Sequence, residues 1–369
     1  MSCSSETQPF LLRRIHQDTF GRPVPANVTM IFTPSDYGLR RSSEASIGGP
    51  PFLKSAFMRD HSQGVLIVNE HIDFVARKLS AKYSVFKAWE AIAPADQASV
   101  KALVVAGEAA FDRSIVSDFP NVRLIACLTS GYDGIDLAWA AGRGIDVTHA
   151  VGVNHDDVAD HALGLMIAWE RGLVEGNQAV LSGKWSAERK TLTRSMEELR
   201  IGIVGMGAIG KAIAARCVGF KLDVEWWGPH PKPDIDLRRR ETLTDLAAAS
   251  DVLFVCSRAE RANRHMISDE VQNALGPNGL LINVARGSLV DEDALILNLK
   301  SGKLGGAALD VFETEPTDPG RWRDVPNVIL TPHTGGATLK AISKMITQLE
   351  SNLDALFDGK ELVTQVTLQ

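Results

Sequence analysis

Three segments of the sequence place an arginine, two glutamates and a histidine just after short apolar runs. Arg286 follows GLLINVA, Glu313 and Glu315 follow GAALDVF, and His333 follows NVILTP. Such runs are typical of buried parallel strands, whose carboxyl ends share the sheet edge at which open α/β folds bind ligands. A guanidinium can hold an anionic group, and an imidazole can transfer a proton near neutral pH. Taken singly, Arg286 could instead be a surface ion-pair residue and His333 a helix cap, and Glu313 competes with Glu315 because it comes first after its strand.

A glycine motif, GMGAIG, lies between the apolar run RIGIV and a helix-like stretch. Gly205 can make a tight turn, Gly207 lets the backbone approach a pyrophosphate, and Gly210 allows close packing of helix and strand. A helix beginning at Ala208 and Ile209 would direct free N–H groups at a phosphate. This order of strand, turn and helix predicts a dinucleotide site, and the alternative is a glycine-rich turn without a ligand.

The type of dinucleotide depends on the residue that ends the next predicted strand, LDVEWWG. An NAD-selective site has an acid at this position, but the sequence has Gly228, and Glu225 lies in mid-strand. Without that carboxylate nothing repels a 2′-phosphate, and His230 and Lys232 offer positive charge to it. We therefore expect NADP(H) as the preferred cofactor and NAD(H) as the alternative. The absence of an arginine immediately after the strand weakens the case for NADP(H).

Four motifs occur together in the order of one known family. They are SGYDGIDL (130–137), NVARGSLVDEDAL (283–295), LDVFETEP (309–316) and TPHTGGAT (331–338). With these motifs the chain resembles the D-2-hydroxyacid dehydrogenases, which include glyoxylate/hydroxypyruvate reductases, D-lactate dehydrogenases and phosphoglycerate dehydrogenase. The resemblance implies an enzyme that transfers a hydride between a nicotinamide cofactor and the C2 carbon of a small 2-keto or 2-hydroxy acid.

The resemblance also implies roles for single residues. Arg286 matches the cation that holds the substrate carboxylate and polarises the ketone, and His333 matches the acid/base. Glu315 matches the carboxylate that orients His333 and favours its protonated form. Ser130 and Gly131 match the loop whose backbone N–H groups bind the substrate carboxylate, although the family often has an aliphatic residue in place of Ser130.

Further cofactor contacts follow from the same match. Asp310 matches a position near the nicotinamide carboxamide, but it could equally be a structural hydrogen-bonding residue. Cys256, Ala285 and His333 are also expected to line the cofactor site.

Two other functions stay open. A non-catalytic NAD(H) sensor, like the corepressor branch of the family, could keep Arg286, Glu315 and His333, and the unusual N-terminal region favours this alternative. A formate or phosphite dehydrogenase could share the same scaffold. Glutamine in place of Glu315 would be expected for formate oxidation, so the glutamate argues against formate and says nothing about phosphite. No motif fixes the keto acid, which could be glyoxylate, hydroxypyruvate or a bulkier aryl or alkyl pyruvate.

Length and composition limit the remaining classes. A chain of 369 residues is too long for one small core, so two domains are expected. A net charge of −6 argues against a nucleic-acid partner. The four cysteines lack metal-ligand spacing, which predicts neither a metal site nor a disulfide framework. No apolar run reaches the ~18 residues of a membrane span and no signal peptide is recognisable, so we expect a cytoplasmic protein without a membrane contact.

Alternation of strand-like and helix-like stretches predicts the domain organisation. We expect an α/β fold with two parallel-sheet domains, Rossmann-like or flavodoxin-like, separated by a cleft. Residues 1–61 would form an N-terminal extension with one strand candidate, VTMIF (28–32). The substrate domain would be discontinuous, 62–153 and 334–369, with the dinucleotide-binding domain, 154–333, inserted into it. Strands are predicted for ten runs: GVLIVN, KALVVAG, RLIACL, GIDVTHA, RIGIVG, LDVEWWG, DVLFVC, GLLINVA, GAALDVF and NVILTP.

Three helices are predicted from their patterns. Residues 156–172 become apolar almost all round, which favours burial at a subunit interface, so we expect a homodimer that uses this region. Residues 337–358 carry a single apolar stripe and should pack on a domain. Asp291 should cap a third helix, which Gly302 should close.

Overall fold

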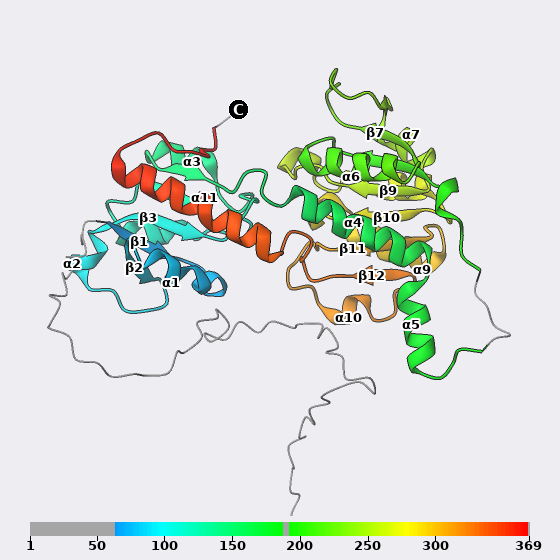
Figure 1. The fold of residues 1–369 in the computed structure, drawn as a ribbon, viewed down its shortest axis with the longest axis horizontal. Coiled ribbons are helices and arrows are strands. Elements are labelled where there is room, and N and C mark those ends of the chain that lie inside the picture. Colours follow the sequence, from blue (N-terminus) through cyan, green and yellow to red (C-terminus); the bar gives the residue numbers. More distant parts are fainter. Residues whose placement is uncertain (1–62, 187–191, 368–369) are drawn as a thin grey trace, which may run out of the picture. The chain divides into compact units, whose positions relative to one another are not determined.

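The structure is a computed structural model that describes residues 63–186 and 192–367, and all of these belong to one compact unit. The predicted extension 1–61 and its strand candidate VTMIF lie outside the described residues. Two parallel sheets, each with helices packed against it, make up the described part of the chain (Figure 1). The predicted fold class is therefore confirmed.

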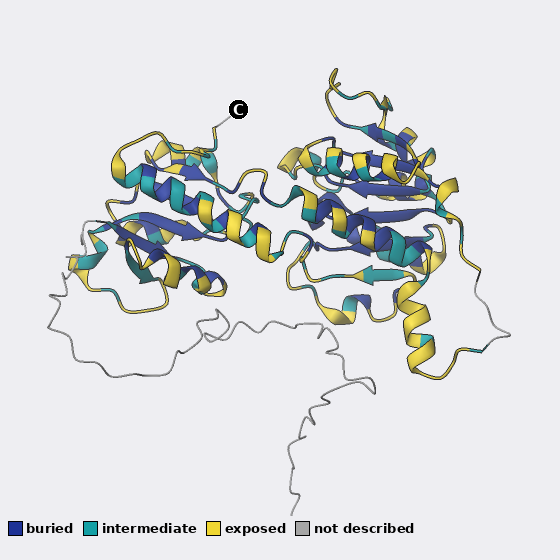
Figure 2. Cartoon of the chain, in the orientation of Figure 1, coloured by how far each residue is buried: buried dark blue, intermediate teal, exposed yellow. Residues whose placement is uncertain are grey.

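The smaller sheet has five parallel strands in the order β2-β1-β3-β4-β5. Their residues are largely Val, Leu, Ile and Ala, and three of the strands are buried along their whole length or nearly so (Figure 2). This composition is expected for a parallel sheet covered on both faces. The bounds are β1 (Gly64–Ile67), β2 (Ser84–Lys87), β3 (Val100–Val105), β4 (Leu124–Cys127) and β5 (Asp146–Thr148).

The larger sheet has seven parallel strands in the order β12-β11-β10-β9-β6-β7-β8. Strands β7 and β8 are added on one side of β6, and β9 to β12 are added on its other side. The loops after β6 and β9 therefore flank a topological switch point, where such sheets bind ligands. The bounds are β6 (Arg200–Val204), β7 (Asp223–Trp227), β8 (Arg238–Arg239), β9 (Val252–Val255), β10 (Leu280–Asn283), β11 (Gly306–Leu309) and β12 (Val328–Leu330).

The helices connect the strands and cover the sheets. The α-helices are α1 (Ala76–Leu79), α2 (Pro94–Gln97), α3 (Leu137–Gly142), α4 (His155–Glu170), α5 (Leu173–Leu181), α6 (Ala208–Gly219), α7 (Leu243–Ala248), α8 (Asp269–Leu275), α9 (Glu292–Ser301), α10 (Pro319–Trp322) and α11 (Leu339–Asp358). Short 3-10 helices span Glu70–Val75, Arg113–Asp118, Met196–Glu198, Arg261–Asn263 and Gly287–Leu289.

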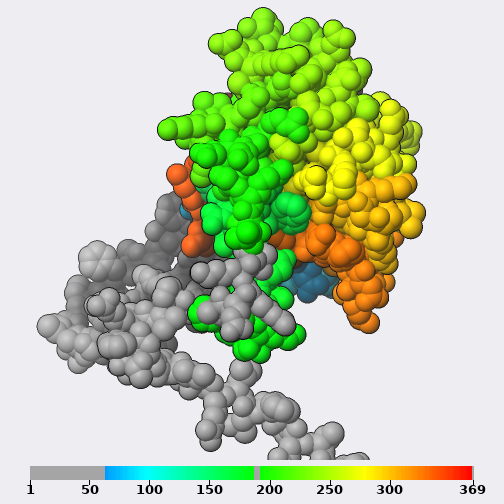
Figure 3. Space-filling model, turned by 90° about the vertical axis from the view of Figure 1, so that its right-hand side faces the viewer, coloured from blue at the N-terminus to red at the C-terminus, as the bar shows by residue number. Residues whose placement is uncertain are grey.

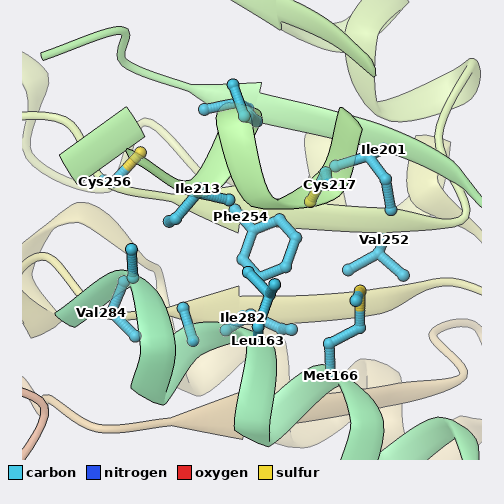
Figure 4. Packing of buried hydrophobic residues seen from close by; sticks show 14 of the residues in the cluster. Leu163, Met166, Ile201, Ile213, Cys217, Val252, Phe254, Cys256, Ile282 and Val284 are labelled. Atoms are coloured by element: carbon cyan, nitrogen blue, oxygen red, sulfur yellow. The ribbon is translucent and has the colours of Figure 1, made fainter. Parts of the chain in front are cut away.

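Packing in the core of the larger sheet positions the glycine turn. Phe254 of β9 is fully buried between α6 and α4, and Leu163 and Met166 of α4 pack from one side (Figure 4). Ile213 and Cys217 of α6 close the other side. Since α6 starts at the glycine motif, this packing fixes the position and direction of the first turn of the helix.

The helix caps follow the predicted chemistry. The Asp291 side chain accepts a hydrogen bond from the Ala294 N–H at the start of α9, and Gly302 ends that helix with a φ of 71°. The apolar stripe of α11 packs Met345, Leu349 and other residues against the smaller sheet, as predicted. Both predictions are confirmed.

All ten predicted strands are present, but β2, β8 and several helices, α5 among them, were not predicted. β2 is only partly buried and β8 has two residues, so neither forms a clear apolar run. α5 has no buried residue in the single chain.

Within the single chain, the helix of the predicted interface region 156–172 is buried on one side only, and its burial by a partner subunit stays a prediction. Within α4, Asp156, Asp160 and Gly164 are exposed at a spacing of four residues and form one open stripe. The buried side of α4 packs on β10 and α6.

Among the described helices, none is long and apolar enough to cross a membrane.

Candidate active site

A cavity of about 1250 Å³ lies at the carboxyl ends of the strands of both sheets. Because parallel strands end at one edge, loops that are distant in sequence meet there. The cavity is lined by residues that include Ser130, Gly131, Tyr132, Asp133, His149, Gly207, Ala208, Ile209, Cys256, Arg258, Ala285, Arg286, Asp310 and His333. Most of the predicted site residues therefore share one cavity.

His333 follows β12 and is held by both backbone and side-chain contacts. Its backbone has a φ of 53°, in the left-handed region, and its N–H donates to the Asp310 carbonyl at 2.8 Å. Its ring Nδ1 lies 2.7 Å from Glu315 Oε2. Since Nδ1 is taken by the glutamate, Nε2 is the ring nitrogen left for the cavity.

The electrostatics of this pair favour a charged imidazole. The hydrogen bond with Glu315 raises the pKa of His333 above its usual value, against burial and Arg286, which lower it. Burial raises the pKa of Glu315, but the hydrogen bonds from His333 and from the Phe312 N–H outweigh burial and leave this pKa lowered. The pair can therefore supply a proton from the histidine while the glutamate stays ionised.

Glu313, the rival carboxylate, has different partners. It lies 2.9 Å from His265 Nε2 and also pairs with Arg264. The two glutamates of ETEP thus contact two different histidines, and Glu315 is the one at His333.

Arg286 follows β10 and reaches across to the loop after β4. Its Nη1 donates to the Ala285 carbonyl at 2.7 Å, and its Nε donates to both carboxylate oxygens of Asp133 at 3.1 and 3.2 Å. A Cβ built at Gly131 would overlap Nη2 of Arg286. A larger residue at position 131 would force the guanidinium to move, so glycine allows the loop and Arg286 to approach in this arrangement.

The loop after β4 is tied down by a second histidine. The Ser130 carbonyl lies 2.9 Å from His149 Nδ1, and the Ser130 hydroxyl donates to Asn154 Oδ1 at 3.2 Å. Burial and the charge of Arg258 lower the pKa of His149. A neutral imidazole can therefore hold this loop without adding charge to the cavity.

Asp310, at the end of β11, anchors the loop that carries His333. One carboxylate oxygen accepts from the Thr331 hydroxyl at 2.6 Å and the Thr334 N–H at 2.9 Å, and the other accepts from the Gly335 N–H at 2.8 Å. Burial raises the pKa of Asp310, but the hydrogen bonds from His161, Thr331 and the loop lower it overall. These contacts are those of the structural alternative, and the expected nicotinamide contact stays a prediction.

The glycine motif forms a cradle that fits a phosphate. Gly205 has a φ of 95°, and a Cβ built at Gly210 would overlap the Gly205 carbonyl, so both positions require glycine. A Cβ at Gly207 would meet nothing within 4 Å, which leaves open space at the N-terminus of α6. Such a terminus presents unpaired N–H groups and a positive dipole to an anion. Residues of this chain therefore fit a dinucleotide cofactor.

Cys256 forms part of the floor of this cradle. Its thiol donates to the Gly205 carbonyl at 3.1 Å, and burial raises its pKa to about 12. The side chain therefore acts as a small neutral group and not as a nucleophile.

β7 ends at Trp227, and Gly228 follows it next to the glycine cradle. Glu225 faces away from this point, because Arg238 and Arg240 both pair with it. Lys232 donates to the carbonyl of Met206 in the glycine motif at 2.9 Å, and the side chain of His230 is exposed. No acid therefore occupies the position expected for NAD selectivity.

Comparison with known proteins identifies the family. Residues 163–335 match the model of the D-isomer specific 2-hydroxyacid dehydrogenase, NAD binding domain. Glyoxylate/hydroxypyruvate reductase A of Arabidopsis thaliana is 37% identical over 310 residues, which cover 83% of this chain and 99% of that protein. The chain belongs to the D-2-hydroxyacid dehydrogenase family. Hydroxyphenylpyruvate reductase of Plectranthus scutellarioides is 35% identical over 82% of this chain and 98% of that protein.

A solved structure agrees with this assignment. The NADPH-dependent glyoxylate/hydroxypyruvate reductase of Sinorhizobium meliloti, in complex with NADP and malonate, superposes with a TM-score of 0.77. It is 32% identical, and the match covers 83% of this chain and 97% of that chain. The predicted family, the two-domain fold and the class of NAD(P)-dependent oxidoreductase are confirmed.

Several cavity residues were missed by the sequence analysis. Asp133 stands within the motif SGYDGIDL, but nothing in the pattern links it to Arg286, which is 153 positions away. Arg258 also lines the cavity and lies 4.7 Å from the ring centroid of Tyr132. Only the position of Arg258, directly after the predicted strand DVLFVC and Ser257, could have suggested it.

Proposed function

We propose that the chain reduces a small 2-keto acid to the D-2-hydroxy acid, with NADPH as the preferred donor and NADH as the alternative. One observation carries the proposal. His333, which is held by Glu315, and Arg286 line the same cavity as Gly207, Ala208 and Ile209 at the start of α6. This cavity joins an acid, a carboxylate-binding cation and a phosphate site, which are the groups that such a reduction requires.

In this proposal Arg286 and the loop at Ser130 and Gly131 bind the carboxylate of the keto acid. Arg286 also faces the ketone oxygen, so its charge stabilises the alkoxide that develops during reduction. A bound nicotinamide supplies the hydride. His333 Nε2 then gives its proton to the alkoxide, and Glu315 holds the ring through Nδ1 and stabilises its protonated form.

Substrate binding has a competitor in the same chain. Asp133 occupies the Nε side of Arg286, and Ala285 accepts from Nη1, so Nη2 is the donor left towards Gly131. A substrate carboxylate must therefore share the guanidinium with Asp133 or displace it. Repulsion between the two carboxylates would favour displacement.

The proposed cofactor contacts follow the cradle from one end to the other. Backbone groups from the glycine turn hold the pyrophosphate: Gly205, Gly207, Ala208, Ile209 and Gly210. Gly228, His230 and Lys232 surround the adenosine end, while Cys256, Ala285, Asp310 and His333 line the nicotinamide half. Two findings support NADPH, namely the missing acid at Gly228 and the NADP in the Sinorhizobium meliloti structure.

We further propose a division into a substrate domain, 62–153 and 334–369, and an inserted dinucleotide-binding domain, 154–333. A homodimer would bury 156–172 and the adjacent α5. In support, Leu173, Val180 and Leu181 of α5 are exposed by 53, 59 and 79%. The segment containing α5 also lies at the surface (Figure 3, green). A cytoplasmic location stays a prediction.

A spectroscopic assay tests the proposal. Purified protein is mixed with glyoxylate, hydroxypyruvate, pyruvate or phenylpyruvate, each with NADPH and with NADH, and the loss of reduced-nicotinamide absorbance is followed. We expect turnover of at least one keto acid that His333→Ala abolishes. Tight cofactor binding without any turnover would contradict the proposal and favour the non-catalytic sensor.

A further inference from the structure

An arginine from β8 lies at the point where β7 ends. Arg239 Nη2 and Nε donate to the Gly228 carbonyl at 2.7 and 3.2 Å. Its guanidinium carbon also lies 5.9 Å from the ring centroid of Trp226. β8 pairs with β7 in the register Trp226 to Arg239, and this pairing carries the arginine to its position. Arg239 is eleven positions after Gly228 and was not visible as a neighbour in the sequence.

The three consecutive arginines of this segment divide between the two faces of the sheet. Arg238 and Arg240 both pair with Glu225 on one face. Arg239 points to the other face, because successive side chains of a strand alternate. In residues 63–186 and 192–367, no carboxylate lies within ion-pair distance of Arg239, although Arg238 and Arg240 share one. Arg239 therefore carries a charge that the described chain does not neutralise.

The location of this charge decides what it can bind. Gly228 directly follows β7. It lies next to the glycine cradle, because the Gly205 N–H donates to the carbonyl of the preceding residue, Trp227, at 2.9 Å. A carboxylate at position 228 would hold the hydroxyls of an adenosine ribose. In its place the structure has a buried glycine with a guanidinium on its carbonyl oxygen. The Gly228 carbonyl uses two N–H groups of the guanidinium, which has five in total and so keeps three for another acceptor.

We propose that Arg239 binds the 2′-phosphate of NADPH and is the main determinant of cofactor choice in this chain. The inference rests on the proposed function and deepens its cofactor assignment. A phosphate with about −1.5 to −2 charges suits a fork of parallel N–H donors. The contact with Trp226 and the Gly228 carbonyl holds that fork in place before the nucleotide arrives, whereas His230 is exposed. Lys232 also carries a positive charge, but its ammonium donates to the Met206 carbonyl and acts as a single point charge.

Nucleotide binding tests this inference without any turnover. Dissociation constants of the full chain are measured by fluorescence for NADPH and NADH, and for the fragments adenosine 2′,5′-bisphosphate and adenosine 5′-monophosphate. Arg239→Ala should weaken NADPH and the bisphosphate roughly 10- to 100-fold, the usual size for loss of a hydrogen bond to a charged group. NADH and the monophosphate should change less than about threefold. Arg239→Lys should retain part of the preference.

Arg238→Ala is the matched control. It removes the same charge from the adjacent position of the same strand, but its side chain is 68% exposed and pairs with Glu225 on the opposite face. The NADPH to NADH affinity ratio should stay at the wild-type value in this variant. The ratio also cancels any loss of folded protein.

Two results would overturn the inference. An equal loss of affinity for NADPH and NADH in Arg239→Ala would show that the arginine only supports the end of β7. An equal fall of the ratio in Arg238→Ala would show a general charge effect. In either case, turnover of a keto acid with wild-type chain would leave the proposed function standing, so the two failures are distinguishable.

Discussion

The chain holds two histidine–glutamate pairs of similar local geometry, and they differ in what surrounds them. His333 lies 2.7 Å from Glu315, and His265 lies 2.9 Å from Glu313. Both histidines have positive φ values, 53° and 55°. In the first pair the histidine uses Nδ1 and lines the cavity with Arg286, whereas in the second the histidine uses Nε2 and shares its glutamate with Arg264.

A histidine–carboxylate contact therefore does not by itself make an active site. Arg264 already pairs with the glutamate of the His265 pair, and Nε2 of His265 is taken by that glutamate. In the His333 pair, Nε2 stays available and the guanidinium of Arg286 lines the same cavity. The proposed chemistry depends on this free nitrogen and on Arg286, and each can be tested against the other pair.

The largest effect is expected from removing the two histidines separately. His333→Ala should lower kcat by roughly 10²–10⁴-fold, the usual contribution of a general acid. His265→Ala is the matched control, because it also removes a positive-φ histidine from a glutamate, and it should change kcat less than about threefold. Steady-state kinetics with the best keto acid measure both. A loss below tenfold in His333→Ala, or equal losses in the two variants, would move the proton donor elsewhere.

Arg286 is the second feature that separates the pairs. Arg286→Ala should raise KM for the keto acid and lower kcat, because the guanidinium contacts both the bound substrate and the developing alkoxide. The combined loss in kcat/KM should be on the order of 10²–10³-fold, as for a lost oxyanion donor. Arg286→Lys keeps the charge but loses the planar fork, so it should recover only part of the activity. Unchanged kinetics in Arg286→Ala would reject this role.

The pH dependence tests the coupling within the first pair. Reduction needs the protonated imidazole, so kcat/KM should be level below the pKa of His333 and fall above it. Glu315 raises this pKa and Arg286 lowers it. Glu315→Gln should therefore move the fall to lower pH and reduce kcat by about tenfold, while Arg286→Ala should move it to higher pH.

Glu313→Gln is the control for this profile. It removes the same charge two positions earlier, from the glutamate that contacts His265, so it should leave the pH profile in place. A shift of equal size in Glu313→Gln would contradict the assignment of Glu315 to His333.

The two pairs also show how far the sequence could be interpreted. Both glutamates follow the strand run GAALDVF within one short segment, and the sequence offered no physical reason to prefer either. Which of them meets His333 depends on the backbone path of the turn, and that path is set by tertiary contacts such as the Phe312 N–H on Glu315. The strands, the glycine turn and the cap at Asp291 were predictable because their signals are local.

Contacts between distant segments could not be predicted in this way. Asp133 meets Arg286 only because β4 and β10 end at the same cavity. Arg239 meets Gly228 because a strand of two residues pairs with β7, and so short an element has no periodicity. The residues around Arg286 and His333 can therefore be found from motifs, whereas the surroundings of Gly228 depend on the pairing of distant segments.

The smallest effect is expected at that adenosine end, and it should leave both pairs untouched. Gly228→Asp restores the acid of an NAD site beside Arg239, so the two side chains should pair and the ratio of kcat/KM for NADPH over NADH should fall about tenfold or more. A Cβ at this position lies 3.2 Å from Trp226 Cζ3, so the ring must give way slightly. Gly228→Asn adds the same bulk without the charge and should change the ratio much less. The pH at which kcat/KM falls should be unchanged in both variants, because neither substitution contacts His333. Equal ratios in the two variants would show that the bulk of the side chain at position 228, and not its charge, governs the choice between NADPH and NADH.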